Sequence, residues 1–226
     1  MVNNNSILSF KNISKSYGNQ IILNDISLEI ENGKAIAIVG QSGTGKTTFL
    51  NISGLIDTPD TGKIFYKNQD VSDFNEMERS LFRNKHIGFI FQMHYLLPQC
   101  TVIENILIPT LTNKNKSEKN ASIKRAKELL DQLGMIENIN KLPGQLSGGE
   151  CQRTACIRAL INQPELILAD EPTGSLDEES ATILFTELLK LNKELNTTLL
   201  LVTHSMKLAE QMDMILQLKN HKLSKN

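Results

Sequence analysis

The sequence predicts an α/β fold, with a mostly parallel sheet covered by helices and a small antiparallel sheet near the N-terminus. Short, continuously apolar runs recur at residues 35–39, 86–91, 166–169, 198–203 and 214–218. Such runs are typical of parallel strands that helices cover on both faces. Segments with helical periodicity lie between them, and this alternation indicates a doubly wound core.

The N-terminal region has a different pattern, with a period of two. Ile26, Leu28 and Ile30 alternate with polar residues, and a turn signal at Gly18 and Asn19 precedes them. Alternation of this kind predicts antiparallel strands with one solvated face. We therefore expect the antiparallel sheet to be formed before the first parallel strand.

Two longer segments carry apolar residues at helical spacing. They are residues 122–134 and 181–195, and each has the apolar stripe of a helix packed on a core. The polar tract at residues 112–120 has no such stripe, so we expect an exposed loop there.

Composition excludes several classes of protein. The chain has 226 residues, 40% of them hydrophobic and 22% charged, and a net charge of −1, so neither disorder nor a basic nucleic-acid footprint is indicated. No apolar run approaches the ~18–20 residues of a membrane helix, and the first residues do not resemble a signal peptide. Three cysteines without a Cys-x-x-Cys pair favour reduced thiols over a zinc site or a disulfide framework.

A complete phosphate-binding loop follows the run at residues 35–39. It has the form G-x-x-x-x-G-K-[ST] and opens a helical stretch at residues 48–55, which is the context that this motif requires. Glycines let backbone N–H groups surround phosphate oxygens, Lys46 reaches the β- and γ-phosphates, and Thr47 offers a hydroxyl to Mg²⁺. The alternative is a glycine-rich turn that binds nothing. The residues expected at the nucleotide are Gly40, Gln41, Ser42, Gly43, Thr44, Gly45, Lys46, Thr47 and Thr48.

Polar side chains follow three other predicted strands. Gln92 comes after residues 86–91, Asp170 and Glu171 after residues 166–169, and His204 after residues 198–203. Ligands of open α/β sheets bind beyond the carboxyl ends of the strands, so we expect these four side chains at the phosphate loop.

Each of these side chains has a predicted role and a simpler alternative. We expect Asp170 to hold Mg²⁺ through water and Glu171 to act as general base on the attacking water. His204 and Gln92 would contact the γ-phosphate, with Gln92 also near Mg²⁺. The alternatives are a helix-capping acid pair, a structural histidine and a surface glutamine.

A second glycine-rich helix start lies at Ser147, Gly148, Gly149 and Glu150. Ser147 and Glu150 fit a capping box for the helix at residues 151–161, but two glycines weaken a first helical turn. They expose backbone N–H groups at the positive end of the helix, which suits a second phosphate site. Because one nucleotide needs only one such site per chain, we expect a head-to-tail dimer in which each chain completes its partner's pocket.

In this order and spacing, the motifs resemble the ATP-binding subunit of an ABC transporter, over residues 8–223. The resemblance implies a single domain over residues 1–226: a P-loop NTPase core with an N-terminal antiparallel β subdomain and a helical subdomain inserted at about 93–148. It implies ATP and Mg²⁺ as ligands and a homodimer of ATPase subunits. By the same resemblance Tyr17 stacks on adenine, and the segment ending at Asp177 crosses the dimer interface.

Within the family, the chain is similar to the lipoprotein-releasing LolD type, through residues 53–57, 91–98, 101–105 and 169–174. That similarity implies integral membrane subunits of the LolC and LolE kind, a lipoprotein as indirect cargo, and a position on the cytoplasmic face of the inner membrane. A MacB-like exporter and an FtsE-like regulatory ATPase share much of the pattern and stay open as alternatives. A soluble ABC ATPase of translation or DNA repair is disfavoured, because one motif set and a near-neutral charge do not fit it.

Overall fold

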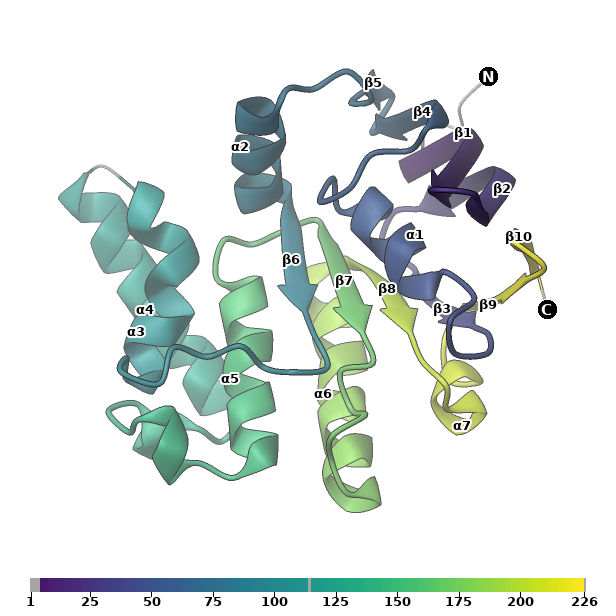
Figure 1. Ribbon diagram of the computed structural model, residues 1–226. Helices are drawn as coiled ribbons and strands as arrows, with labels where there is room; N and C mark the ends of the chain where they lie inside the picture. Colours follow the sequence, from purple (N-terminus) through teal and green to yellow (C-terminus); the bar gives the residue numbers. More distant parts are fainter. Residues whose placement is uncertain (1–4, 114, 226) are drawn as a thin grey trace.

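Two β-sheets and the helices packed on them make up the computed structural model, which describes residues 5–113 and 115–225 (Figure 1). The smaller sheet is antiparallel, with strand order β2-β1-β4-β5. Its strands are β1 (Ser6–Tyr17), β2 (Gln20–Glu31), β4 (Thr61–Tyr66) and β5 (Gln69–Asp70). The predicted antiparallel sheet is therefore confirmed, and it gains two strands that follow the phosphate loop.

The larger sheet has strand order β10-β9-β3-β8-β7-β6. All its pairings are parallel except that of β9 with β10, which confirms the mostly parallel sheet. Its strands are β3 (Ala35–Val39), β6 (Ile87–Ile90), β7 (Leu166–Asp170), β8 (Thr198–Val202), β9 (Met214–Lys219) and β10 (Lys222–Lys225).

The parallel strands are buried on both faces because successive side chains point to opposite sides of the sheet. On β3, Ala35 and Ala37 belong to a core shared with most of the helices, whereas Ile36 and Ile38 face the helix after the phosphate loop, α1 (Lys46–Ser53), and the antiparallel sheet. These two layers of core explain why the parallel strands read as continuous apolar runs. No helix in the described ranges has both the length and the apolar character needed to cross a bilayer.

Every element between residues 93 and 148 in the described part of the chain is helical. Residues of this segment share one hydrophobic core with the parallel sheet. Its elements are α3 (Val102–Leu107), α4 (Lys116–Gln132) and three short 3₁₀ turns at Ile108–Thr112, Ile136–Asn138 and Pro143–Gln145. The remaining helices are α2 (Glu76–His86), α5 (Gly148–Leu160), α6 (Glu178–Leu195) and α7 (Met206–Ala209).

The predicted loop at residues 112–120 is wrong over its second half, because α4 begins at Lys116. Asn115 caps this helix by accepting a hydrogen bond from the backbone N–H of Glu118. The first turns of α4 lie in solvent, so they need no apolar stripe, and local capping is enough to begin the helix there. Lys114 lies outside the described residues.

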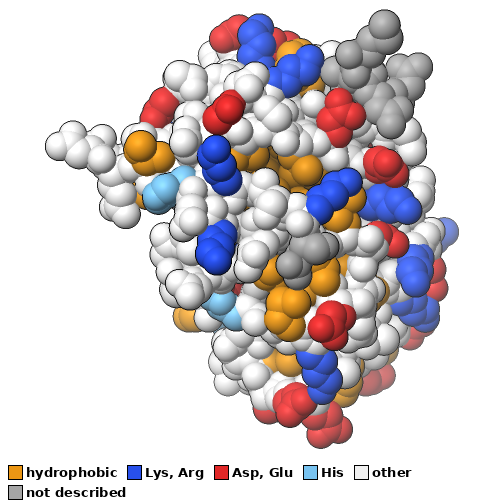
Figure 2. Space-filling model, turned by 90° about the vertical axis from the view of Figure 1, so that its right-hand side faces the viewer, with side chains coloured by type: hydrophobic (Ala, Val, Ile, Leu, Met, Phe, Trp, Pro, Cys, Tyr) orange, Lys and Arg blue, Asp and Glu red, His pale blue; other side chains and the backbone are white. Residues whose placement is uncertain are grey.

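The end of the molecule that carries the antiparallel sheet and β10 has a mixed surface. Figure 2 shows acidic and basic side chains beside one another on this face, with apolar groups between them. The described residues of this face thus form no basic patch, which agrees with a net charge of −1.

Candidate functional site

Four neighbouring strands of the larger sheet end at one edge. The strands β3, β8, β7 and β6 lie side by side and parallel, so their carboxyl ends coincide. The phosphate loop follows β3, His204 follows β8, Asp170 and Glu171 stand at the end of β7, and Gln92 follows β6. The topology of the sheet thus confirms that these residues follow strands that end at one edge.

The phosphate loop has a backbone that only glycine accommodates without strain. Gly43 and Gly45 have φ angles of +77° and +102°, and a Cβ on Gly45 would lie 2.6 Å from Ile22 Cγ2. The loop leads directly into α1, whose first N–H groups have no acceptor within the helix. An exposed hollow of ≈ 220 Å³ lies at the loop, and Ser42 and Thr48 are among its lining residues. The loop therefore presents backbone donors to an anion.

Lys46 lies in the wall of this hollow and is 5% exposed. Its ammonium donates hydrogen bonds of 2.9 Å each to the carbonyl oxygens of Gly40 and Gln41. Burial lowers the pKa of Lys46 below its ordinary value, and the negative charges of Glu171 and Asp170 offset part of that effect. Lys46 is thus a buried cation at the phosphate loop, where it can form charge-assisted hydrogen bonds with phosphate oxygens.

Thr47, in the first turn of α1, contacts Asp170 at the end of β7. The Thr47 hydroxyl donates a hydrogen bond of 2.8 Å to Asp170 Oδ2. A hydroxyl and a carboxylate at this separation form an all-oxygen donor set, which is the chemistry that Mg²⁺ prefers. The residues present therefore fit a magnesium ion.

Glu171 and His204 form the second pair at this edge. His204 Nε2 lies 2.6 Å from Glu171 Oε1. Glu171 adopts a φ of +45°, which is uncommon for a residue with a side chain, and its backbone N–H donates to Val202 O at 2.9 Å. Strain of this kind persists where surrounding bonds enforce it and is concentrated at functional sites. Both side chains line the same hollow as Lys46.

Gln92 lies against the segment that follows Glu171. A Cβ on Gly174 would approach Gln92 Nε2 to 3.1 Å, and the Ser175 hydroxyl donates to Gln92 O at 3.4 Å. The next helix, α6, is capped by Asp177, whose carboxylate accepts from the Ser180 backbone N–H at 2.9 Å. This hydrogen bond lowers the pKa of Asp177. Gln92 contacts the segment after Glu171, and Asp177 follows that segment in the sequence. Neither residue is among those that line the hollow at the phosphate loop.

The predicted capping box at Ser147 is confirmed. Ser147 Oγ accepts from the Glu150 N–H at 3.3 Å, and Glu150 Oε2 accepts from the Ser147 N–H at 2.7 Å. The helix nevertheless begins at Gly148 and not at residue 151, so both glycines lie inside its first turn. None of these residues lines the hollow at the phosphate loop of the same chain.

Packing within the chain does not require these two glycines. A Cβ on Gly148 would meet nothing nearer than Leu176 Cδ2 at 3.8 Å, and one on Gly149 nothing nearer than Ser180 at 3.8 Å. Both are ordinary contact distances, and neither glycine has a positive φ. The bare backbone of this helix start has no explanation inside the described monomer.

Tyr17 lies at the end of β1 with its side chain half exposed. Its hydroxyl donates to Asp57 Oδ2 at 2.6 Å and lies near the side chain of Thr48 in the first turn of α1. The hydrogen bond to Asp57 raises the pKa of Tyr17. The ring is outside the hollow at the phosphate loop but on its side of the molecule, because Thr48 lines that hollow.

Sequence reasoning missed the side chains that hold the backbone after Gln92. Gln152 donates to Phe91 O at 2.8 Å, and Arg158 donates to Tyr95 O at 2.8 Å and to His94 O at 2.6 Å. These bonds tie the segment around Gln92 to α5, the helix that begins at the two glycines. No sequence signal identifies them, because their acceptors are backbone carbonyls more than 60 residues away.

Comparison with known proteins finds a family and relatives that match most of the chain. A family profile described as ABC transporter matches residues 23–174. The chain is 44% identical over 224 residues to the lipoprotein-releasing system ATP-binding protein LolD of Rickettsia bellii, which covers 97% of this chain and 98% of that protein. The corresponding LolD of Bacteroides fragilis is 47% identical over 207 residues, 92% of this chain and 95% of that protein.

Two solved structures are similar over nearly the whole fold. One is described as the dimeric structure of MJ0796, a bacterial ABC transporter cassette, with a TM-score of 0.86, 36% identity and coverage of 96% of this chain and 98% of that one. The other is a dimeric post-hydrolysis state of the same cassette bound to ADP and Pi, with a TM-score of 0.85, 36% identity and the same coverage.

Proposed function

The chain belongs to the ABC transporter family of ATPases, and we propose that it is the ATP-hydrolysing subunit of a lipoprotein-releasing transporter in the bacterial inner membrane. The observation that carries the proposal is the 44% identity, over 97% of the chain, to a protein named for lipoprotein release. The phosphate loop and the side chains of Asp170, Glu171 and His204 at the sheet edge support the ATP-hydrolysing part of the proposal. On this proposal the chain lies on the cytoplasmic face, and the lipoprotein meets the membrane subunits, not this protein.

The hydrolytic roles are assigned from the contacts at the sheet edge. Lys46 and the loop N–H groups bind the phosphates, while Thr47 and Asp170 would hold Mg²⁺, which would neutralise phosphate charge. Glu171 takes the proton of the attacking water as general base. His204, 2.6 Å from Glu171, orients that carboxylate and contacts the γ-phosphate. Gln92 links the occupancy of the site to the segment held by α5.

We assign the second phosphate site to a partner copy. The glycines at 148 and 149 have room for side chains within the monomer, so their bare N–H groups serve something outside it. Ser147, Gly148, Gly149 and Glu150 would therefore close over the nucleotide of the opposite chain, with Asp177 near the interface. Similarity to a cassette described as dimeric supports a homodimer. Tyr17 stacks on the adenine of its own chain's nucleotide.

The membrane partner is assigned to a groove between the sheet and the helical segment. A hollow of ≈ 450 Å³ is lined by Phe89 and Phe91 on the sheet side, by Pro109 of the helical segment and by Arg158 of α5. Ile56, which is 46% exposed, lies at the same groove. Together with the helical subdomain at about 93–148, this groove suits an apolar segment of a membrane subunit of the LolC or LolE kind.

Depletion in the native organism tests the proposed function. Cells depleted of the chain are complemented with the wild type or with Lys46→Ala, and lipoproteins are quantified in separated inner and outer membranes. We expect lipoproteins to accumulate in the inner membrane without the wild type, and Lys46→Ala not to restore their release. Normal lipoprotein distribution in depleted cells would contradict the proposal.

A further inference from the structure

We propose that Asp57, fixed by Lys15, is a positioning residue that sets the Tyr17 ring for contact with the nucleotide base. The inference rests on the proposed function, because it takes Tyr17 as the surface on which the base stacks. It adds a positioning residue that lies outside the motifs of the phosphate site.

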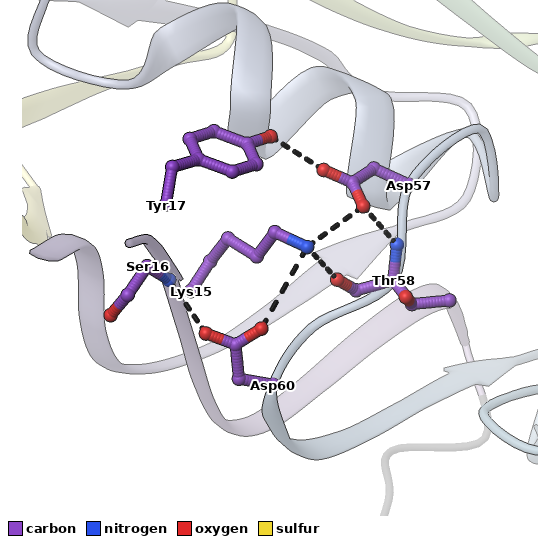
Figure 3. Close-up of polar contacts among 6 residues, drawn as sticks. All are labelled: Lys15, Ser16, Tyr17, Asp57, Thr58 and Asp60. Carbon is purple, nitrogen blue, oxygen red and sulfur yellow. Dashed lines mark hydrogen bonds and ion pairs between the residues drawn. The ribbon is translucent and has the colours of Figure 1, made fainter. Parts of the chain in front are cut away.

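The cluster joins two parts of the chain that are about 40 residues apart (Figure 3). Asp57 accepts two side-chain hydrogen bonds, one on each oxygen: Lys15 Nζ lies 2.8 Å from Oδ1 and Tyr17 Oη lies 2.6 Å from Oδ2. The Asp57 carboxylate therefore bridges two alternate side chains of β1. Lys15 Nζ is also 5.2 Å from the centroid of the Tyr17 ring, a cation–π distance.

Lys15 provides a rigid anchor for this carboxylate. The residue is 8% exposed, and its ammonium also donates to Thr58 O at 2.7 Å and lies 3.8 Å from Asp60 Oδ1. Burial alone would raise the pKa of Asp57, but the bonds from Lys15 and Tyr17 hold it below its ordinary value. Asp57 is thus a fixed carboxylate, and the direction of its second oxygen is set before any ligand binds.

The bond to Tyr17 is not needed to satisfy the buried lysine. Lys15 already has Asp57 Oδ1, the Thr58 carbonyl and Asp60, so its charge is compensated without the tyrosine. The Tyr17 side chain is half exposed, and without Asp57 its hydroxyl would have only Thr48 and solvent as partners. The Oδ2 contact therefore orients an exposed aromatic ring, which is a feature expected of a binding surface rather than of a core.

The same cluster fixes the ring relative to the phosphate loop. Asp57 follows α1, and its N–H donates to Asn51 O at 3.2 Å on that helix. Thr48, in the first turn of α1, lies near the Tyr17 hydroxyl. The aromatic ring and the helix that begins at the phosphate loop are therefore held as one unit. The spacing between a stacked base and its phosphates is consequently built into the protein before binding.

A double-mutant cycle tests this inference with two ligands. Tyr17→Phe removes only the hydroxyl and keeps the ring, and Asp57→Asn removes the charge with little change in size. Each variant and their combination are titrated with ATP and with inorganic tripolyphosphate, which has phosphates but no base. Asp70→Asn is the matched control: Asp70 pairs with Lys63 at 2.7 Å in the same antiparallel sheet and has no contact with Tyr17 in the structure.

We expect Tyr17→Phe to raise the Kd for ATP about threefold to tenfold, because the ring keeps its stacking surface but loses the bond that fixes its direction. The Kd for tripolyphosphate should stay unchanged. Asp57→Asn acts in the same direction and adds nothing to Tyr17→Phe when combined with it, because it acts through that ring. In both variants the KM for ATP rises while kcat stays constant. Asp70→Asn leaves the Kd for ATP and the Kd for tripolyphosphate unchanged.

Three results would overturn the inference: wild-type ATP affinity in Tyr17→Phe, a parallel loss of tripolyphosphate affinity, or additive effects of the two substitutions. Urea unfolding of each variant separates these outcomes from a loss of fold, and Tyr17→Phe stays informative if Asp57→Asn is unstable, because it leaves the Lys15–Asp57 pair in place. Lys46→Ala is titrated in parallel. Unchanged affinity of Lys46→Ala for both ligands would instead overturn the proposed phosphate site itself.

Discussion

Replacement of Glu171 by glutamine separates nucleotide binding from hydrolysis at the sheet edge. The substitution keeps the size of the side chain, and the glutamine oxygen still accepts from His204 Nε2, which lies 2.6 Å from Oε1 in the wild type. The backbone bond from Glu171 N–H to Val202 O does not depend on the side chain. We therefore expect the fold and ATP affinity to be preserved.

The rate of hydrolysis changes, because an amide does not accept the proton of the attacking water. A positioned general base contributes about 10²- to 10⁴-fold to a rate, which corresponds to about 3–5 kcal/mol of activation free energy at ~1.4 kcal/mol per tenfold. We expect phosphate release at saturating ATP to fall by that factor. The trapped ATP state keeps the chain dimeric on size exclusion.

The control for this experiment is Glu178→Gln. Glu178 is an acidic residue shortly after Glu171, and its partner is Lys207 at 2.7 Å on the surface. We expect it to hydrolyse ATP like the wild type. Wild-type turnover in Glu171→Gln itself would refute the assignment of the general base.

The other predictions concern binding, assembly, acid stability and the thiols. Lys46→Ala abolishes ATP binding, so ATP no longer raises its melting temperature in thermal-shift measurements. Ser147→Arg folds as a monomer but shows no ATP-driven dimer by size exclusion, whereas Ser147→Ala loses only the helix cap and about 1 kcal/mol of unfolding free energy in urea. The pKa of Asp57 lies below its ordinary value, so its stabilisation is present above about pH 4 and is lost as pH falls further. Urea titrations from pH 6 to pH 3 should accordingly show the difference between the wild type and Asp57→Asn shrinking with acidification. Burial raises the pKa of Cys156 to about 12 and that of Cys151 above its usual value, so iodoacetamide at neutral pH labels only Cys100 in the folded protein, as read by peptide mass.

The features predictable from the sequence were those with local or topological signals. The phosphate loop and the capping box at Ser147 are short-range patterns whose geometry follows from their own residues. The convergence of Asp170, Glu171 and His204 is not local, but it follows once the strands are parallel, because parallel strands end at the same edge.

Other features had no such signal. Helix α2 has no buried residue, and Met77 and Leu81, one turn apart, are exposed, so no core-facing stripe marks it, although Asn75 and Glu78 form a capping box at its start. Helix α4 has a buried stripe only in its second half, so its start at Lys116, in the exposed polar tract, has no periodic signal. The contact of Tyr17 with Asp57 joins residues 40 apart in the chain, and neither hydrophobic periodicity nor a motif relates them.

The most direct test of the central claim is a pull-down of the trapped ATPase. Tagged Glu171→Gln is expressed in the native organism, held with ATP and Mg²⁺, solubilised gently and purified, and its partners are identified by mass spectrometry. The account predicts integral membrane subunits together with bound lipoproteins. Membrane partners without lipoproteins would contradict lipoprotein release and favour an exporter or a regulatory ATPase, and recovery of soluble partners only would contradict the assignment to a transporter.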